Sequence, residues 1–288
     1  MTPQHFRLDD QVAVITGGGG GIGRAIALSF ASVGADIVIG DIVPERCNET
    51  VLRVQELGRS ALGVPMDAMA TDQIRGLINA ARKRFGHIDI LVNNVGGTSR
   101  RPFLEQSERS WRRHIELNLV SMLTATSAAA DAMIERGRGG CIINVSSIEA
   151  SRAAPCYAVY AACKAGMVSF TRTMAVELAN HGIRVNAIAP DATATPGLRG
   201  YSEGPVDPSS WAEVSPEEKD AVARRIPLGR EGIDSECGSV AVFLAAKASS
   251  YVTGAIIPVD GGTWASSGWV RNRAGSWVLA EVLPTTGS

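Results

Sequence analysis

A glycine-rich turn between an apolar run and a helical pattern constrains this chain most. Residues 12–15 form a short apolar run typical of a buried strand, and residues 24–30 show helical periodicity. Between them lie five consecutive glycines, 17–21, followed by Ile22 and Gly23. Glycine permits positive φ and lets the backbone approach a ligand closely, and a helix that begins near Gly21 would point free N–H groups at an anion. The context therefore favours a pyrophosphate-binding turn over a flexible linker.

Apolar runs and helical patterns continue to alternate along the chain. We expect further strands at residues 34–40, 61–66, 86–94, 141–145, 183–188 and 255–259, and helices at 44–57, 71–85, 107–134, 156–180 and 234–246. The strands are continuous apolar runs, which is typical of a parallel sheet covered on both faces. The sequence predicts one α/β domain over residues 1–288: a Rossmann-type, doubly wound fold with about seven parallel strands and helices on both faces.

Polar residues and a proline stand at the ends of the expected strands. They are Asp41, Asp67, Asn94, Ser147 and Pro190. The carboxyl ends of parallel strands meet at one edge of a sheet, where such folds bind ligands. We therefore expect these scattered residues to gather at one edge.

Composition excludes several classes of partner. The formal net charge of −1 gives no electrostatic footprint for nucleic acid or an anionic membrane. The first ten residues have no apolar signal region, and no apolar run approaches a membrane span. The five cysteines are odd in number and lack metal-ligand spacing, so we expect free thiols, no metal site and a cytoplasmic protein.

A tyrosine and a lysine share one face of the expected helix 156–180. Tyr160 and Lys164 are four residues apart, which makes their side chains neighbours on a helix. A free tyrosine titrates near ~10, and a fixed cation beside it favours the phenolate and lowers that pKa. Such a tyrosine can exchange a proton with an alcohol or carbonyl oxygen. Tyr157 is the alternative, but four residues after it lies Ala161.

Several ordered motifs together resemble the short-chain dehydrogenase/reductase family over about residues 8–263. Thr16–Gly23 matches T-G-x-x-x-G-I-G, residues 93–96 are close to N-N-A-G with Val95 in place of alanine, and Ser147 precedes Tyr160 by 13 residues. The resemblance implies an enzyme that transfers a hydride between a nicotinamide cofactor and a secondary alcohol or ketone.

The resemblance also implies roles for residues at matching positions. Lys164 would bind the nicotinamide ribose and Tyr160 would pass the proton, while Ser147, with Ser146 as the adjacent alternative, would orient the substrate oxygen. Asn118 matches a helix-distorting asparagine that holds a water against the lysine; a solvent-facing or core amide is the alternative. The cofactor contacts would come from Gly17, Gly20, Gly21, Ile22, Gly23, Asp41, Asp67, Ala68, Asn94, Tyr160, Lys164 and Thr195. For Asn94, a purely structural role is an equal alternative.

Asp41 favours NAD(H) over NADP(H). A carboxylate at the end of the second strand can accept hydrogen bonds from ribose hydroxyls and would repel a 2′-phosphate. Gly18, after the first glycine, offers no cation for that phosphate. The alternative is that Asp41 only caps the next helix.

Residues 191–226 and 264–288 predict a substrate lid and a C-terminal extension. The lid is rich in proline, glycine and charge, and Tyr201, Pro205, Pro208 and Trp211 suggest a partly apolar cover. It begins with Asp191, where the family usually has glycine; a turn cap and a substrate contact both remain open. We expect a lipophilic substrate, steroid-like or a 3-hydroxyacyl thioester.

Other parts of the surface suggest further contacts. Arg100, Arg101 and Arg113 could meet an anionic group, although a solvated basic face is the simpler reading. Similar enzymes are commonly tetramers, so we expect a homotetramer, with Trp264, Trp269 and Trp277 packed on their own or a neighbouring subunit.

Two other functional classes remain open. A non-catalytic nucleotide-binding module would require a damaged tyrosine, lysine and serine set. An isomerase or dehydratase on the same scaffold is the other alternative.

Overall fold

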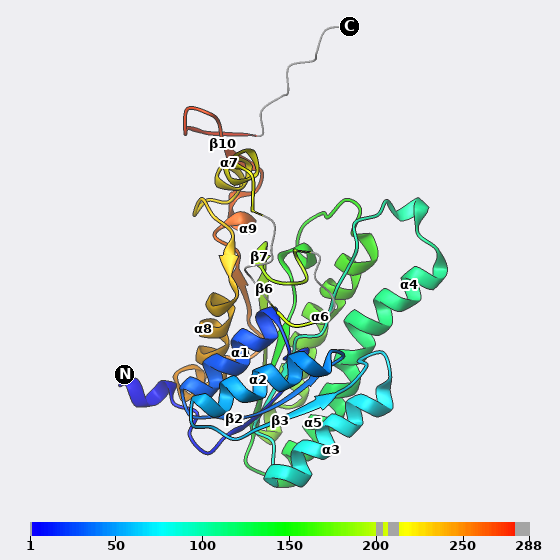
Figure 1. Cartoon of the computed structure of the whole chain (residues 1–288), viewed down its shortest axis with the longest axis vertical. Coiled ribbons are helices and arrows are strands. Elements are labelled where there is room, and N and C mark those ends of the chain that lie inside the picture. Colours follow the sequence, from blue (N-terminus) through cyan, green and yellow to red (C-terminus); the bar gives the residue numbers. More distant parts are fainter. Residues whose placement is uncertain (1, 200–203, 207–212, 280–288) are drawn as a thin grey trace, which may run out of the picture.

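Seven parallel strands form the central sheet of the computed structural model, which describes residues 2–199, 204–206 and 213–279. Their order is β3-β2-β1-β4-β5-β6-β9 (Figure 1). The strands are β1 (Val12–Thr16), β2 (Asp36–Asp41), β3 (Ala61–Pro65), β4 (Ile90–Asn93), β5 (Gly140–Val145), β6 (Ile183–Pro190) and β9 (Ile256–Val259). The doubly wound, Rossmann-type fold is confirmed.

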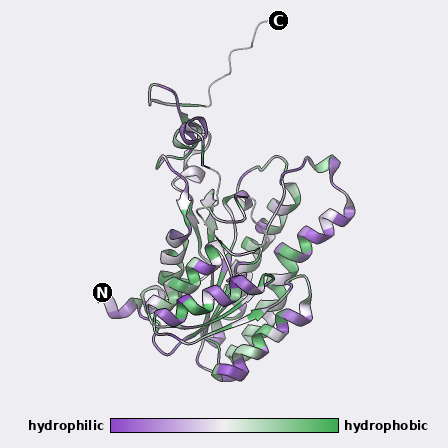
Figure 2. Ribbon diagram, in the orientation of Figure 1, coloured by the Kyte–Doolittle hydropathy of each residue, from purple (hydrophilic) through white to green (hydrophobic). Residues whose placement is uncertain are grey.

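Helices cover both faces of this sheet. They are α1 (Gly21–Ser32), α2 (Pro44–Glu56), α3 (Thr71–Phe85), α4 (Glu108–Ile115), α5 (Ser121–Arg136), α6 (Ala158–Glu177) and α8 (Asp234–Ala245). Side chains alternate along each strand, so Ala13 and Ile15 pack in a cluster with α1, α2 and α8, while Val12 and Val14 pack with α3, α5 and α6. Figure 2 shows the resulting hydrophobic strands inside a more hydrophilic shell.

Two expected helices differ locally from a regular α-helix. The helix expected from residue 156 begins at Ala158, because Cys156 has φ +73° and cannot be helical. The helix expected at 107–134 is interrupted between α4 and α5 by a π-helical turn, Glu116–Val120. Such turns concentrate at functional sites.

A buried polar chain crosses the middle of the sheet. Asn93 Nδ2 donates to Thr126 Oγ1 on α5 at 2.9 Å and to Asn144 Oδ1 at 2.8 Å. Asn144 Nδ2 in turn donates to Thr171 Oγ1 on α6 at 2.9 Å. Because buried polar groups are costly unless paired, this series of side-chain hydrogen bonds fixes α5 and α6 against β4 and β5.

The segment after β6 contains structure that periodicity does not predict. Within residues 191–226 lie β7 (Thr193–Ala194), which pairs with β8 (Gly232–Ile233), and helix α7 (Pro216–Arg225). Ser215 and Glu218 form a capping box at the start of α7, with Pro216 in its first turn. Tyr201, Pro208 and Trp211 lie outside the described residues.

The C-terminal extension folds beside α7. It contains α9 (Thr263–Ser266) and a hairpin of β10 (Trp269–Arg271) and β11 (Trp277–Leu279). Figure 1 shows α7, α9 and β10 together beyond the ends of β6 and β7. Arg271 Nη2 donates to the Pro227 carbonyl at 2.9 Å and its guanidinium lies over the Trp277 ring. The three tryptophans remain about half exposed in this single chain, at 50%, 47% and 44%, so their expected packing is not complete within it.

One helical stretch has the length and composition of a membrane span, and the five thiols are free. Glu108–Arg136 passes that test, but 56% of its apolar window is buried in the fold, as in the core helix of a globular protein. The cysteines all lie in the described part of the chain and form no disulfide.

Candidate functional site

The glycine turn joins β1 to α1 with almost no space for side chains. Gly17 and Gly21 have φ +68° and +51°. A Cβ on Gly23 would lie 2.1 Å from the Gly17 carbonyl oxygen, so no other residue fits there without moving the backbone. At Gly20, the N-cap of α1, the nearest atom to a Cβ would be 3.5 Å away. The turn is tight where it packs, whereas at Gly20 a Cβ would make only ordinary contacts, with Val206, Arg46 and Pro196. Ile22 follows in the first turn of α1.

Two side chains hold this turn in place. Asn94 Nδ2 donates to the carbonyls of Thr16 and Gly17 at 3.1 and 3.0 Å, which ties the turn to the end of β4. The buried Arg24 on α1 donates to the Gly19 carbonyl at 2.6 Å and pairs with Glu49 on α2 at 2.8 Å. Sequence reasoning missed Arg24, because an arginine inside an amphipathic helix carries no signal of a distant partner.

Asp41 lies directly against the glycine turn. Its two carboxylate oxygens accept hydrogen bonds from the Gly19 and Val43 backbone N–H groups at 2.9 and 3.1 Å. The contact with Val43, the residue before α2, agrees with the alternative in which Asp41 caps that helix. The contact with Gly19 places the carboxylate at the glycine turn. Asp67 follows the neighbouring strand β3, and its side chain accepts from the Met69 N–H at 2.9 Å. Ala68 beside it is buried.

Ser147, Tyr160 and Lys164 converge at the end of β5. Ser147 is buried and hydrogen-bonds with the Tyr160 side chain. Lys164, also buried, donates from Nζ to the Val145 carbonyl at 2.7 Å, and its Nζ lies 5.7 Å from the centroid of the Tyr160 ring. Ser146, the alternative serine, points instead at α6, where its hydroxyl donates to the Lys164 carbonyl at 3.2 Å. Of the two serines, Ser147 is thus the one that contacts the Tyr160 side chain.

Burial dominates the protonation of this pair. It lowers the pKa of the Lys164 ammonium from 10.5 to about 8. Burial also raises the pKa of the Tyr160 hydroxyl; the hydrogen bond with Ser147 acts in the opposite direction, and the charge of Glu149 adds to the rise. The expected lowering of the Tyr160 pKa by Lys164 is therefore wrong for this structure, where desolvation outweighs any stabilisation of the phenolate.

Asn118 lies in the π-helical turn and ties it to the loop after β4. Its Oδ1 accepts from the Gly97 N–H at 2.9 Å, and its Nδ2 donates to the Gly97 and His114 carbonyls at 2.9 Å. A Cβ on Gly96 would lie 2.8 Å from Asn118 Oδ1 and 3.1 Å from Lys164 Nζ. Only the backbone of Gly96 therefore lies between the Asn118 side chain and the Lys164 ammonium. Sequence reasoning did not find this constraint.

The segment after β6 reaches back to the glycine turn. Thr195 packs on Gly21, and its Oγ1 accepts from the Leu198 N–H at 3.2 Å. Arg46 on α2 donates from Nε to the Gly204 carbonyl at 2.6 Å. Arg46 and this contact were not predicted, because neither residue belongs to a motif.

Asp191, where the family usually has glycine, meets two arginines. Arg152 and Arg225 lie 3.6 Å from its carboxylate oxygens. Neither arginine was singled out from the sequence. Arg100, Arg101 and Arg113, which were, make no ion pair among the described residues.

The buried ammonium makes the first testable prediction. Below pH 8 the protonated Lys164 costs the fold up to about 3 kcal/mol, and this cost is relieved between pH 8 and 10.5, where the unfolded chain binds more protons. We expect Lys164→Met to raise the free energy of unfolding at pH 7 by about 1–3 kcal/mol and to flatten its rise above pH 8. Urea unfolding at several pH values measures both. Lys83→Met, at an exposed position on α3, is the control; a Lys164→Met variant no more stable than it contradicts the prediction.

Comparison with known proteins agrees with this geometry. Residues 17–263 match the family model described as Enoyl-(Acyl carrier protein) reductase. The chain is 40% identical over 262 residues to 2-dehydro-3-deoxy-D-gluconate 5-dehydrogenase of Escherichia coli, a match that covers 91% of this chain and 98% of that protein.

Solved structures agree as well. A 7α-hydroxysteroid dehydrogenase complexed with NADH and 7-oxoglycochenodeoxycholic acid aligns with a TM-score of 0.83 at 34% identity, over 91% of this chain and 97% of that one. A gluconate 5-dehydrogenase of Burkholderia cenocepacia in complex with NADP and tartrate aligns with a TM-score of 0.81 at 34% identity, over 91% and 98%. The chain belongs to the short-chain dehydrogenase/reductase family.

Proposed function

We propose that this chain is an NAD(H)-dependent oxidoreductase that interconverts a secondary alcohol and a ketone. The observation that carries the proposal is the convergence of the Ser147 hydroxyl, the Tyr160 hydroxyl and the Lys164 ammonium at the sheet edge where the glycine turn begins α1. The dehydrogenases reported above support the reaction class. We further propose one catalytic domain over residues 1–288, with a lid at 191–226, an extension at 264–288 and a cytoplasmic location.

The residues at this edge fit a dinucleotide. The glycines at the N-terminus of α1 suit a pyrophosphate, because the backbone N–H groups there carry no side chains of their own between them and a ligand. Asp41 would accept hydrogen bonds from the adenosine ribose, and Asp67, Ala68 and Asn94 would lie nearest the adenosine. Thr195 would hold the carboxamide and Lys164 the nicotinamide ribose. When bound, the nicotinamide supplies or accepts the hydride.

The chain's own residues manage the proton and the substrate oxygen. Ser147 donates a hydrogen bond to the substrate oxygen and holds it beside the Tyr160 hydroxyl. The raised pKa of Tyr160 keeps the phenol protonated at neutral pH, so it can donate its proton to the oxygen during ketone reduction. In alcohol oxidation the Tyr160 oxygen must first lose its own proton. Asn118, beside Lys164 across Gly96, would hold the water through which the proton reaches solvent.

The intact set of residues disfavours a non-catalytic module, and the NADH assay separates the proposed activity from an isomerase or dehydratase. A non-catalytic nucleotide-binding module has no need of a serine paired with a tyrosine over a buried lysine. An isomerase or dehydratase would cause no net change in NADH absorbance. The lipophilic substrate expected from the sequence stays a prediction, because the names of the reported relatives include both a steroid and a sugar acid.

Loss of the phenol tests the function directly. We expect Tyr160→Phe to lower turnover at least ~1000-fold, because no other described hydroxyl occupies its position, while NADH affinity stays within about threefold. Absorbance at the NADH band with a panel of secondary alcohols and ketones measures turnover. In the native enzyme oxidation should rise with pH and reduction should fall. Substantial residual activity in the variant would contradict the proton-transfer role, and Tyr157→Phe is the matched control.

Asp41 carries the proposed preference for NAD(H). Arg46 is the residue that could oppose it, since this cation lies beside the same turn. We expect a kcat/KM ratio in favour of NADH, and we expect Asp41→Ala to reduce that ratio at least ~10-fold by removing the acceptor for the ribose hydroxyls. Asp36→Ala, at the opposite end of β2, should leave the ratio unchanged. A native preference for NADPH would reject the assignment and point to Arg46.

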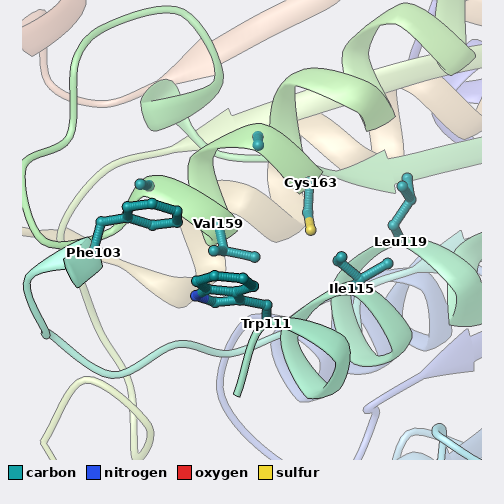
Figure 3. A pocket seen from close by; sticks show the side chains of 8 residues that line it. Phe103, Trp111, Ile115, Leu119, Val159 and Cys163 are labelled. Atoms are coloured by element: carbon teal, nitrogen blue, oxygen red, sulfur yellow. The ribbon is translucent and has the colours of Figure 1, made fainter. Parts of the chain in front are cut away.

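We propose a homo-oligomer, by resemblance a tetramer, in which α4, α5 and α6 meet a second copy. An apolar hollow of about 450 Å³ opens between α4 and α6, and its labelled side chains surround it in Figure 3. The rings of Phe103 and Trp111 stack at one side of it. Ile115 and Leu123, further along the same helical stretch, are 40% and 37% exposed. Exposed apolar surface of this extent is typical of an interface.

A charge in this surface should break the assembly. We expect Ile115→Glu to shift the mass measured by light scattering to that of a smaller species, because burying an unpaired carboxylate in an apolar contact is costly. Leu52→Glu on α2, which is 59% exposed, is the control and should keep the native mass. An unchanged mass in Ile115→Glu would remove this face from the interface.

A further inference from the structure

Asp191 is a buried carboxylate with an incomplete set of partners. Its side chain is only 8% exposed, and Arg152 Nη2 and Arg225 Nη1 approach its two oxygens at 3.6 Å, beyond hydrogen-bond distance. Its Oδ2 is buried without a hydrogen bond. A buried oxygen of this kind is costly, so a protein that keeps it in place has a use for its charge. Here that use is to hold two guanidinium groups at one point.

The two arginines differ in how firmly they are held. Arg152 forms a bidentate pair with Glu149, at 2.7 and 3.1 Å, and this pair raises the arginine pKa. Arg225, the last residue of α7, is 44% exposed, and Asp191 is its only ion-pair partner among the described residues. Its guanidinium therefore keeps donors available for a ligand, and planar guanidinium groups match carboxylates in shape.

Both arginines line a cavity of about 340 Å³. Ser151, Ser266, Trp264 and Trp269 also line it, the last two from α9 and β10 of the C-terminal extension. Hydroxyl groups, guanidinium groups and indole faces suit a chain of hydroxylated carbons that carries an anionic group.

The turn after β5 connects this cavity with the proposed catalytic residues. Ser147 and Ser151 stand at the two ends of the short turn Ile148–Ala150, and Arg152 follows directly after it. Glu149, which holds Arg152, is close enough for its charge to raise the Tyr160 pKa. Asp191 follows β6 directly, and β6 pairs with β5, which ends just before Ser146 and Ser147. A ligand in the cavity can therefore extend toward the Tyr160 hydroxyl.

We propose that the substrate is a polyhydroxylated carboxylic acid whose carboxylate binds Arg225, with Asp191 keeping that arginine in place. This inference rests on the proposed function, because it names the substrate of the same site. The substrate carboxylate displaces nothing that is tightly bonded, since the Asp191–Arg225 contact is already longer than a hydrogen bond. The secondary alcohol of the same molecule then lies toward Ser147 and Tyr160. The two tryptophans pack against its carbon chain.

Matched substrates and matched variants test the proposal. The probes are three aldonates (D-gluconate, D-galactonate and D-mannonate), the alditols of the same carbon skeletons, and a hydroxysteroid, each assayed with NAD⁺. We expect at least one aldonate to exceed its alditol and the steroid in kcat/KM. Arg225→Met should raise the KM for that aldonate about 10–100-fold, the effect of losing a charged hydrogen bond, with kcat within about threefold and the alditol unaffected. Arg225→Lys should restore part of the loss.

The controls separate this inference from the proposed function. Arg224→Met changes the neighbouring arginine of α7, which pairs with Asp220 on its own helix, and should leave every KM unchanged. Thermal shift with the aldonates, without turnover, reports binding at Arg225 independently of catalysis. Turnover of the steroid or alditols ahead of all aldonates, or an unchanged aldonate KM in Arg225→Met, would overturn the substrate class alone. Absence of NAD(H)-linked turnover with every alcohol and ketone would instead reject the proposed function.

Discussion

The fold depends on one close backbone contact, the approach of Gly23 to the Gly17 carbonyl. A Cβ at Gly23 would stand 2.1 Å from that oxygen, so the first turn of α1 can lie on the end of β1 only because this position has no side chain. Asn94 and Arg24 then fix the turn to β4 and α2. Because α1 is placed in this way, its N-terminus opens at the same sheet edge as Ser147. The proposed anion site and the proposed proton-transfer site therefore depend on the same packing.

The buried polar chain through Asn93, Asn144 and Thr171 performs the same task for α6. Asn144 stands directly before Val145, whose carbonyl receives the Lys164 ammonium, and Thr171 lies two turns beyond Lys164 on α6. A slip of α6 along β5 would break both hydrogen bonds and leave buried groups unpaired. The position of Tyr160 relative to Ser147 is thus set by contacts that take no part in the chemistry. The lowered pKa of Lys164 shows the energetic cost of burying its charge at this point.

Sequence reasoning predicted the parts that depend on local pattern. Apolar runs such as 12–15 identify the strands, and glycines at a fixed spacing identify the turn. Both signals lie within a few consecutive residues, so they can be recognised without knowledge of distant contacts. Ser215 and Glu218 form a capping box, but no helix is predicted within residues 191–226, because proline, glycine and charge obscure the periodic pattern of α7. Arg152 and Arg225 carried no such signal, since the partner that gives them meaning, Asp191, lies on a different segment of the chain. The direction of the Tyr160 pKa failed for a related reason: adjacency on a helix reveals the cation but not the desolvation that opposes it.

The segment between β6 and α8 touches both halves of the site. At Gly204 it accepts a hydrogen bond from Arg46 beside the glycine turn, and at Arg225 it reaches the polar cavity beyond Tyr160. Asp191 is the first residue of this segment. It places a carboxylate where a glycine would have no side chain and would leave the backbone more flexible. At this position, where the family usually has glycine, the Asp191 carboxylate brings together Arg152 from the turn after β5 and Arg225 from the end of α7.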